Sequence, residues 1–88
     1  MILVPSLEVR LRSRTSAIFG RNLRRARLEA SLTQGDLARR TGLRQKDISM
    51  IESGSQNVKL LTAVALASAV GHELWAMVSA DNHLKTRS

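Results

Sequence analysis

Residues 33–54 read TQGDLARRTGLRQKDISMIESG, two short runs of helical periodicity on either side of Gly42. The Thr33 hydroxyl can accept from the Asp36 amide while the Asp36 carboxylate reaches back, which is a capping box at the start of a helix. Gly42 supplies the left-handed backbone that ends a helix sharply. The stretch therefore predicts one helix ending near Thr41, a tight turn, and a second helix from about Arg44 or Gln45 to Ser53, closed by Gly54 in the same manner.

The second of these helices has an outer face that suits base recognition in DNA. Ile48 and Ile51 are expected to point inward, because they lie about one turn apart and are apolar. A helix held outward by a bihelical unit can enter a major groove, where Gln pairs with adenine, Lys and Arg with guanine, and Met with a thymine methyl. An ordinary solvated helix face is the alternative interpretation, because Gln, Lys and Ser are common on such faces. The predicted base-reading residues are Arg44, Gln45, Lys46, Ser49 and Met50.

Two elements are expected before this unit. The sequence LEVRLR at residues 7–12 alternates strictly between apolar and charged side chains, which predicts a half-buried strand. Thr15 or Ser16 then suits the start of a helix whose apolar stripe is Phe19, Leu23, Ala26 and Ala30.

Two further elements are expected after it. Asn57 is a good cap for a helix that continues to Val70 and ends at Gly71. Residues 72–80 fit a short strand better than a helix, because the run is brief and lacks a clear cap. The expected fold is mostly α: four helices of a helix-turn-helix domain with short strands at both ends, the C-terminal one in a dimer sheet.

These elements divide the chain into an N-terminal basic arm or strand (1–14), a DNA-binding domain (15–71), a dimerisation strand (72–80) and a flexible tail (81–88). At 88 residues and 43% hydrophobic composition, one thin core is all the chain can build. No cysteine is present to add a disulfide, so a second subunit is a natural source of extra burial. We expect a homodimer.

The charge is strongly positive, with a formal net value of +7. An acid-free group of arginines stands out among residues 10–27: Arg10, Arg12, Arg14, Arg21, Arg24, Arg25 and Arg27. Such a group is commonly a solvated face, but clustered on one side of a small domain it attracts a polyanion. The role of the N-terminal part of this group stays open.

Other function classes find little support. The chain has two histidines, no cysteine, no glycine-rich phosphate loop and no paired acids, so no catalytic constellation, metal site or cofactor is expected. RNA-binding modules stack bases on aromatic rings, and only Phe19 and Trp75 are aromatic. The apolar residues 2–4 stop at Pro5, far short of a signal peptide or membrane span, so a cytoplasmic, nucleoid-associated protein is expected.

The sequence from about Phe19 to Gly71 resembles the Cro- and phage-repressor-like (XRE) helix-turn-helix family. The matching residues are Leu23 and Arg27, then TQGDLARRTG, then Ile48, Ile51, Glu52 and Gly54. The resemblance assigns Gln34 to phosphate contact and to bracing the recognition helix, and it makes Arg27 and Glu52 a partly buried structural ion pair. Ser31 departs from the family pattern, which often has Gly there.

Further phosphate contacts are expected from the segment before the fourth helix, because helix N-termini suit anions. With Gln34, the predicted phosphate-binding residues are Ser55, Asn57 and Lys59.

The ends of the chain look most like HipB-type antitoxins, which implies an autorepressor whose partner is a HipA-like kinase toxin and whose C-terminal strand builds a dimer sheet. Such a sheet removes an open strand edge and duplicates the recognition helix for a palindromic operator. Trp75 is the expected anchor, although it could instead complete its own core. The predicted interface residues are Leu74, Trp75, Ala76, Met77 and Val78.

Two hypotheses therefore remain for a DNA-binding transcriptional repressor. One is the antitoxin of a kinase toxin; the other is a free-standing phage-type repressor or controller with no protein partner beyond itself.

Overall fold

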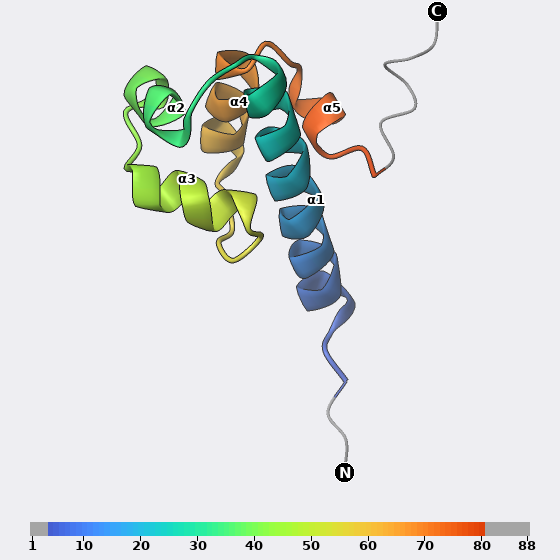
Figure 1. Cartoon of the computed structure of the whole chain (residues 1–88). Helices are drawn as coiled ribbons and strands as arrows, with labels where there is room; N and C mark the ends of the chain where they lie inside the picture. Colours follow the sequence, from blue (N-terminus) through green and yellow to red (C-terminus); the bar gives the residue numbers. More distant parts are fainter. Residues whose placement is uncertain (1–3, 81–88) are drawn as a thin grey trace, which may run out of the picture.

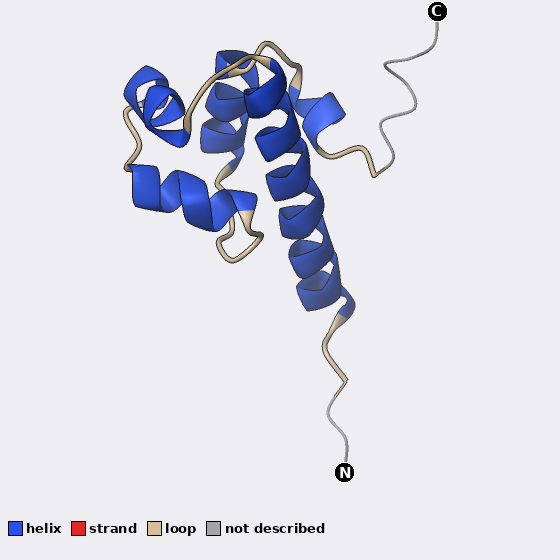
Figure 2. Cartoon of the chain, viewed as in Figure 1, coloured by secondary structure: helices blue, strands red, loops and turns tan. Residues whose placement is uncertain are grey.

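The computed structural model describes residues 4–80, and every regular element in that range is a helix (Figure 2). The helices are α1 (Leu7–Glu29), α2 (Gln34–Thr41), α3 (Gln45–Glu52), α4 (Leu60–Ala69) and α5 (Leu74–Met77). α1 runs the length of the molecule, with α2 and α3 on one side of it and α5 on the other (Figure 1).

One core joins the five helices. Its fully buried side chains come from every helix: Leu23, Leu37, Ile48, Ile51, Leu66 and Met77. α3 packs against both α1 and α2, while α4 packs against α2 and α5. α3 is thus held at the edge of the domain by its inner side alone.

Local sequence explains the ends of the helices around α3. Thr33 and Asp36 form the predicted capping box, in which the Asp36 amide donates to Thr33 Oγ1 at 2.9 Å and the Thr33 amide donates to Asp36 Oδ2 at 2.8 Å. Gly42, Gly54 and Gly71 have φ values of 76°, 79° and 83°, where a side chain would be strained. The predicted two helices and their tight turn are confirmed.

Both predicted strands are wrong. Residues 7–12 form the first turns of α1, whose start is capped by Ser6 through a bond from the Val9 amide to Ser6 Oγ of 3.2 Å, and not by Thr15 or Ser16. The alternating sequence there also places Leu7 and Leu11 at helical spacing, and within residues 4–80 no strand exists for it to pair with.

Residues 72–80 contain the short helix α5 in place of a strand. The buried Asn22 side chain donates to the carbonyl oxygens of Met77 and Ser79, at 2.9 Å each, which fixes the segment against α1. Met77, predicted at a dimer interface, is 2% exposed and belongs to the core.

The fourth helix begins later than predicted. Asn57 does not cap it, because α4 starts at Leu60 after an extended Lys59. The Asn57 side chain is engaged elsewhere, since its Oδ1 accepts from Ser16 Oγ of α1 at 2.8 Å. The tail predicted for 81–88 lies outside the described residues.

Candidate nucleic-acid interface

The side chains on one side of α3 are buried, and most of those on the opposite side are exposed. Ile48 and Ile51 are 0% and 2% exposed and anchor the helix in the core. On the opposite side, Gln45, Lys46 and Ser49 are exposed and Met50 is half-buried. These four side chains lie on the outer side of a helix whose position is fixed by its buried side.

Arg44, immediately before α3, is exposed but already paired. Its Nε and Nη2 donate to the two Asp47 carboxylate oxygens at 2.9 and 3.3 Å. This bond from Arg44 is the main reason that the pKa of Asp47 lies below its ordinary value. The Asp47 side chain is only 18% exposed and lines a hollow with residues of the loop that follows α3. In this arrangement a phosphate or base would share the Arg44 guanidinium with Asp47.

A buried polar cluster holds α1, α2 and α3 together. Arg27 donates through Nε to Glu52 Oε2 at 2.6 Å and through Nη2 to Glu52 Oε1 at 2.9 Å, and both side chains are under 10% exposed. Gln34 Nε2 donates to the same Oε1 at 3.1 Å, and Arg27 Nη1 donates to the Leu32 carbonyl at 2.8 Å. Gln34 thus lies at the start of α2 with its amide tied to the end of α3.

The loop between α3 and α4 carries the other predicted phosphate-binding residues on one exposed edge. Ser55, Asn57 and Lys59 are all exposed. Ser55 shares a hydrogen bond with Ser53 (2.7 Å between the two Oγ atoms), and Asn57 is held by Ser16 of α1. No acid occurs in the sequence between Glu52 and Glu73. Asp47 on α3 lines the same hollow as Asn57 and Lys59, and its carboxylate is paired with Arg44.

The sequence did not indicate the role of Asn22, and it suggested Ser16 only as the start of a helix. Both are small polar residues within a helix, where such side chains are usually solvated, and only their distant partners reveal that they position α5 and the α3–α4 loop.

Among residues 4–80, no group of His, Asp or Glu side chains could hold a metal ion. Nor does any helix there have the length and apolarity needed to cross a membrane.

Compared with known protein families, residues 23–73 match the family described as "Helix-turn-helix". The chain belongs to the helix-turn-helix family. The chain is 37% identical over 54 residues to an uncharacterized HTH-type transcriptional regulator, y4dJ of Sinorhizobium fredii, and the match covers 61% of this chain and 70% of that one.

Two solved structures resemble this helix-turn-helix regulator. The restriction-modification controller protein C.AhdI of Aeromonas hydrophila is 32% identical with a TM-score of 0.67, and the match covers 70% of this chain and 94% of C.AhdI. The hypothetical transcription factor NHTF of Neisseria is 23% identical with a TM-score of 0.77 over 99% of this chain and 95% of NHTF, a likeness that concerns the fold.

The chain is therefore a DNA-binding transcriptional regulator of the XRE type and not an enzyme, as expected from its sequence. None of these three similar proteins is described as an antitoxin.

Proposed function

We propose that this helix-turn-helix protein is a free-standing, homodimeric transcriptional repressor that reads a palindromic operator with α3. The observation that carries the proposal is the two-sided construction of α3, with Ile48 and Ile51 in the core and Gln45, Lys46 and Ser49 exposed. In this proposal those three residues read base edges, with Arg44 and Met50 at the margins. Acting on operator DNA places the protein in the cytoplasm.

Phosphate contacts position the reading helix in this account. Gln34, Ser55, Asn57 and Lys59 lie at the start of α2 and along the loop before α4, on either side of α3 in the chain. Two of them are already braced, Gln34 by Glu52 and Asn57 by Ser16, so little ordering remains when they meet a backbone. Such contacts fix the register on the duplex without reading sequence.

The dimer interface is proposed to lie on the outer side of α4. It replaces the C-terminal strand interface that was expected from the sequence. Leu60, Leu61 and Val64 are 68%, 81% and 41% exposed, and no charged residue lies between Lys59 and Glu73. A helix that is apolar on all sides is typically buried. Trp75 of α5 and Val78 directly after it are also exposed, at 55% and 41%.

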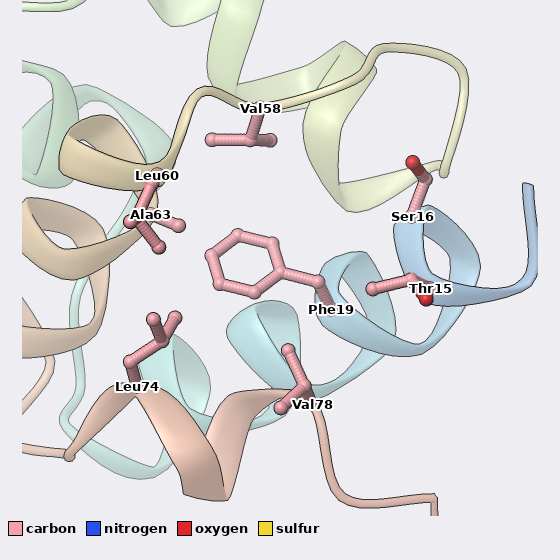
Figure 3. A pocket seen from close by; sticks show the side chains of 8 residues that line it. All are labelled: Thr15, Ser16, Phe19, Val58, Leu60, Ala63, Leu74 and Val78. Carbon is pink, nitrogen blue, oxygen red and sulfur yellow. The ribbon is translucent and has the colours of Figure 1, made fainter. Parts of the chain in front are cut away.

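A hollow of about 230 Å³ lies beside this surface, between α1, α4 and α5. The Phe19 ring projects into it (Figure 3). Around the ring lie Leu60 and Ala63 of α4, Leu74 of α5, and Val78 directly after α5. A large apolar side chain from a two-fold related subunit would fill this space, and the dimer would present two copies of α3.

The free-standing interpretation is preferred to the antitoxin interpretation for two reasons. The C-terminal strand that suggested a HipB-type protein is the helix α5. The similar proteins are a restriction-modification controller, a hypothetical transcription factor and an uncharacterized transcriptional regulator. Co-purification of a kinase with the native protein would restore the antitoxin interpretation.

The test separates base reading from backbone contact. After a preferred site has been selected from random DNA, the affinity of Gln45→Ala and Lys46→Ala for that site should fall by roughly 1 to 3 kcal/mol per lost bidentate contact, with random DNA bound as before. Lys59→Ala should weaken binding to the selected site and to random DNA by a similar factor. Unchanged discrimination in both α3 variants would overturn the proposal.

A further inference from the structure

The first turns of α1, residues 7–14, extend from the domain as a helix without packing; we call them the α1 extension. Every one of these residues is exposed. In Figure 1 the extension continues beyond α3 and the loop that follows it. α1 has 23 residues, about 35 Å of helix at 1.5 Å per residue, and only its C-terminal half contributes buried side chains.

The side of α1 that faces α3 is defined by close contacts. A Cβ atom on Gly20 would lie 2.1 Å from the Ile51 carbonyl oxygen, and one on Gly54 would lie 3.2 Å from Ala17 Cα. With the Ser16–Asn57 bond, these contacts place Ser16, Ala17 and Gly20 toward α3 and its loop.

The same side continues into the extension. Positions three and four residues apart share a helix side, so Ser13 and then Val9 follow Ser16 and Ala17 on it. Arg10 and Arg12 flank that side, one on each edge. A second open hollow lies between Arg12, Leu11 and Glu8 on α1 and Asn57 and Val58 on the loop. The extension thus starts beside the loop proposed to bind phosphates and continues past it.

The charges of the extension favour DNA as its partner. It carries Arg10, Arg12 and Arg14 against the single acid Glu8. Arg10 and Arg14 have no ion-pair partner among the described residues, and they lie at i,i+4, a like-charge spacing that destabilises a helix in isolation. Phosphates would remove that cost.

We propose that the α1 extension is a second DNA-contacting element, in which Arg10 and Arg12 bind the sugar-phosphate backbone next to the phosphate held by Asn57 and Lys59. The inference rests on the proposed DNA-binding face of α3 and extends the footprint beyond it. These contacts add affinity and salt dependence without reading sequence.

Substitution of Glu8 should change DNA affinity in the direction opposite to substitution of Arg10 or Arg12. Its carboxylate lies 3.2 Å from Arg12 Nη2 and is 83% exposed, so in the free protein it neutralises one of the two arginines. Beside DNA the same carboxylate repels phosphates. Glu8→Gln should therefore release Arg12 and tighten DNA binding, a gain that damage to the fold would not produce.

The experiment measures binding of the full chain to a random-sequence DNA duplex over a series of salt concentrations. Arg10→Gln and Arg12→Gln should each lower the slope of log K against log salt by about 0.9, the value for one lost phosphate contact on duplex DNA. The matched control is Arg40→Gln, which also removes one exposed arginine. Arg40 donates to the Ala69 carbonyl at the C-terminal end of α4, whereas Lys59 precedes its N-terminal end. Because Arg40 lies away from the proposed DNA contacts, the salt slope of Arg40→Gln should equal that of the wild type.

Circular dichroism melting checks that each variant is folded. If the wild-type chain binds no DNA, the proposed function itself fails. If the wild-type chain binds but Arg10→Gln and Arg12→Gln match Arg40→Gln, or Glu8→Gln binds more weakly, only the role of the extension is overturned. A solvated face or an acidic protein partner would then account for the arginines.

Discussion

Glu52 is the residue on which the placement of α3 depends most directly. Its two carboxylate oxygens accept three hydrogen bonds, two from Arg27 and one from Gln34, in a site where the Glu52 side chain is 3% exposed. The bond to Glu52 is also the main cause that raises the pKa of Arg27 above its ordinary value, so this guanidinium stays charged. A buried pair of this kind is costly to break from one side, because the remaining charge is left without its partner.

Arg27→Met should therefore lower the free energy of unfolding by about 3 kcal/mol. Arg12→Met is the control, because it breaks the exposed pair with Glu8 and should cost under about 1 kcal/mol. Urea unfolding of both variants measures the difference. Similar losses in the two would show that burial of the Arg27–Glu52 pair contributes little.

Ser31 is strained in its backbone. Its φ is 59°, the one positive value at a non-glycine residue among those described, in the turn between α1 and α2. A left-handed conformation costs an L-residue roughly 1 to 2 kcal/mol. Ser31→Gly should raise the free energy of unfolding by about 1 kcal/mol, whereas Ser68→Gly inside α4 should lower it. Equal effects of the two changes on thermal melting would contradict this reading of Ser31.

Among the elements, α1 and α3 approach each other closely at Gly20. A Cβ atom there would lie 2.1 Å from the Ile51 carbonyl oxygen and 2.8 Å from that of Glu52, both of which are backbone atoms. Gly20→Ala should push the helices apart and cost at least 1 to 3 kcal/mol, roughly the range for overpacking.

Gly35→Ala is the matched control for this prediction. A Cβ atom on Gly35 meets nothing closer than 3.6 Å, and alanine favours a helix over glycine by about 1 kcal/mol. Thermal melting should therefore show Gly35→Ala at or above the wild-type stability and Gly20→Ala well below it. A tolerated Gly20→Ala would mean that α3 is not held closely against α1.

The start of α2 depends on pH through Asp36. Hydrogen bonds from the Thr33 amide and hydroxyl, followed by Arg39, hold the pKa of Asp36 below its ordinary value of 3.8. A lowered folded-state pKa gives stability that is present above the ordinary value and lost as pH falls through it toward the folded value. Asp36→Asn should therefore lose less melting temperature than wild type between about pH 5 and about pH 3. Parallel losses in the two proteins would exclude this contribution.

Some elements could be predicted from the sequence and others could not. Residues 33–54 contain their own start and stop residues, so the helices around the turn at Gly42 and their inward Ile48 and Ile51 could be predicted. LEVRLR could not, because its alternation fits a strand and its Leu7–Leu11 spacing fits a helix, and continuity with the packed part of α1 decides between them. The segment 72–80 depends on Asn22, which is distant in sequence.

At the scale of the whole molecule, the exposed apolar side of α4 predicts self-association. Leu61 has the most exposed large apolar side chain among residues 4–80, at 81%. Leu61→Glu should convert a dimer into a folded monomer, because the charge would be buried in the interface. Leu28→Glu is the control, since Leu28 is 51% exposed on α1 among arginines. Light scattering reports the mass. A monomeric wild type, or a Leu61→Glu protein that remains dimeric, would contradict the α4 interface.

A dimer built in this way would carry two copies of α3 and should meet half-sites about one helical turn, roughly 34 Å, apart. The two-fold symmetry of the protein would then appear in the DNA as an inverted repeat. The spacing of the repeat therefore reports the geometry of the dimer as well as the reading by each α3.

The most direct measurement is selection of binding sites from a pool of random duplex DNA by the full chain, followed by sequencing. We expect an inverted repeat whose two halves lie about one helical turn apart and whose most enriched bases change when Gln45 or Lys46 is replaced by Ala. A pool without enriched sequence, or an enriched site that is the same for the wild type and both variants, would contradict it.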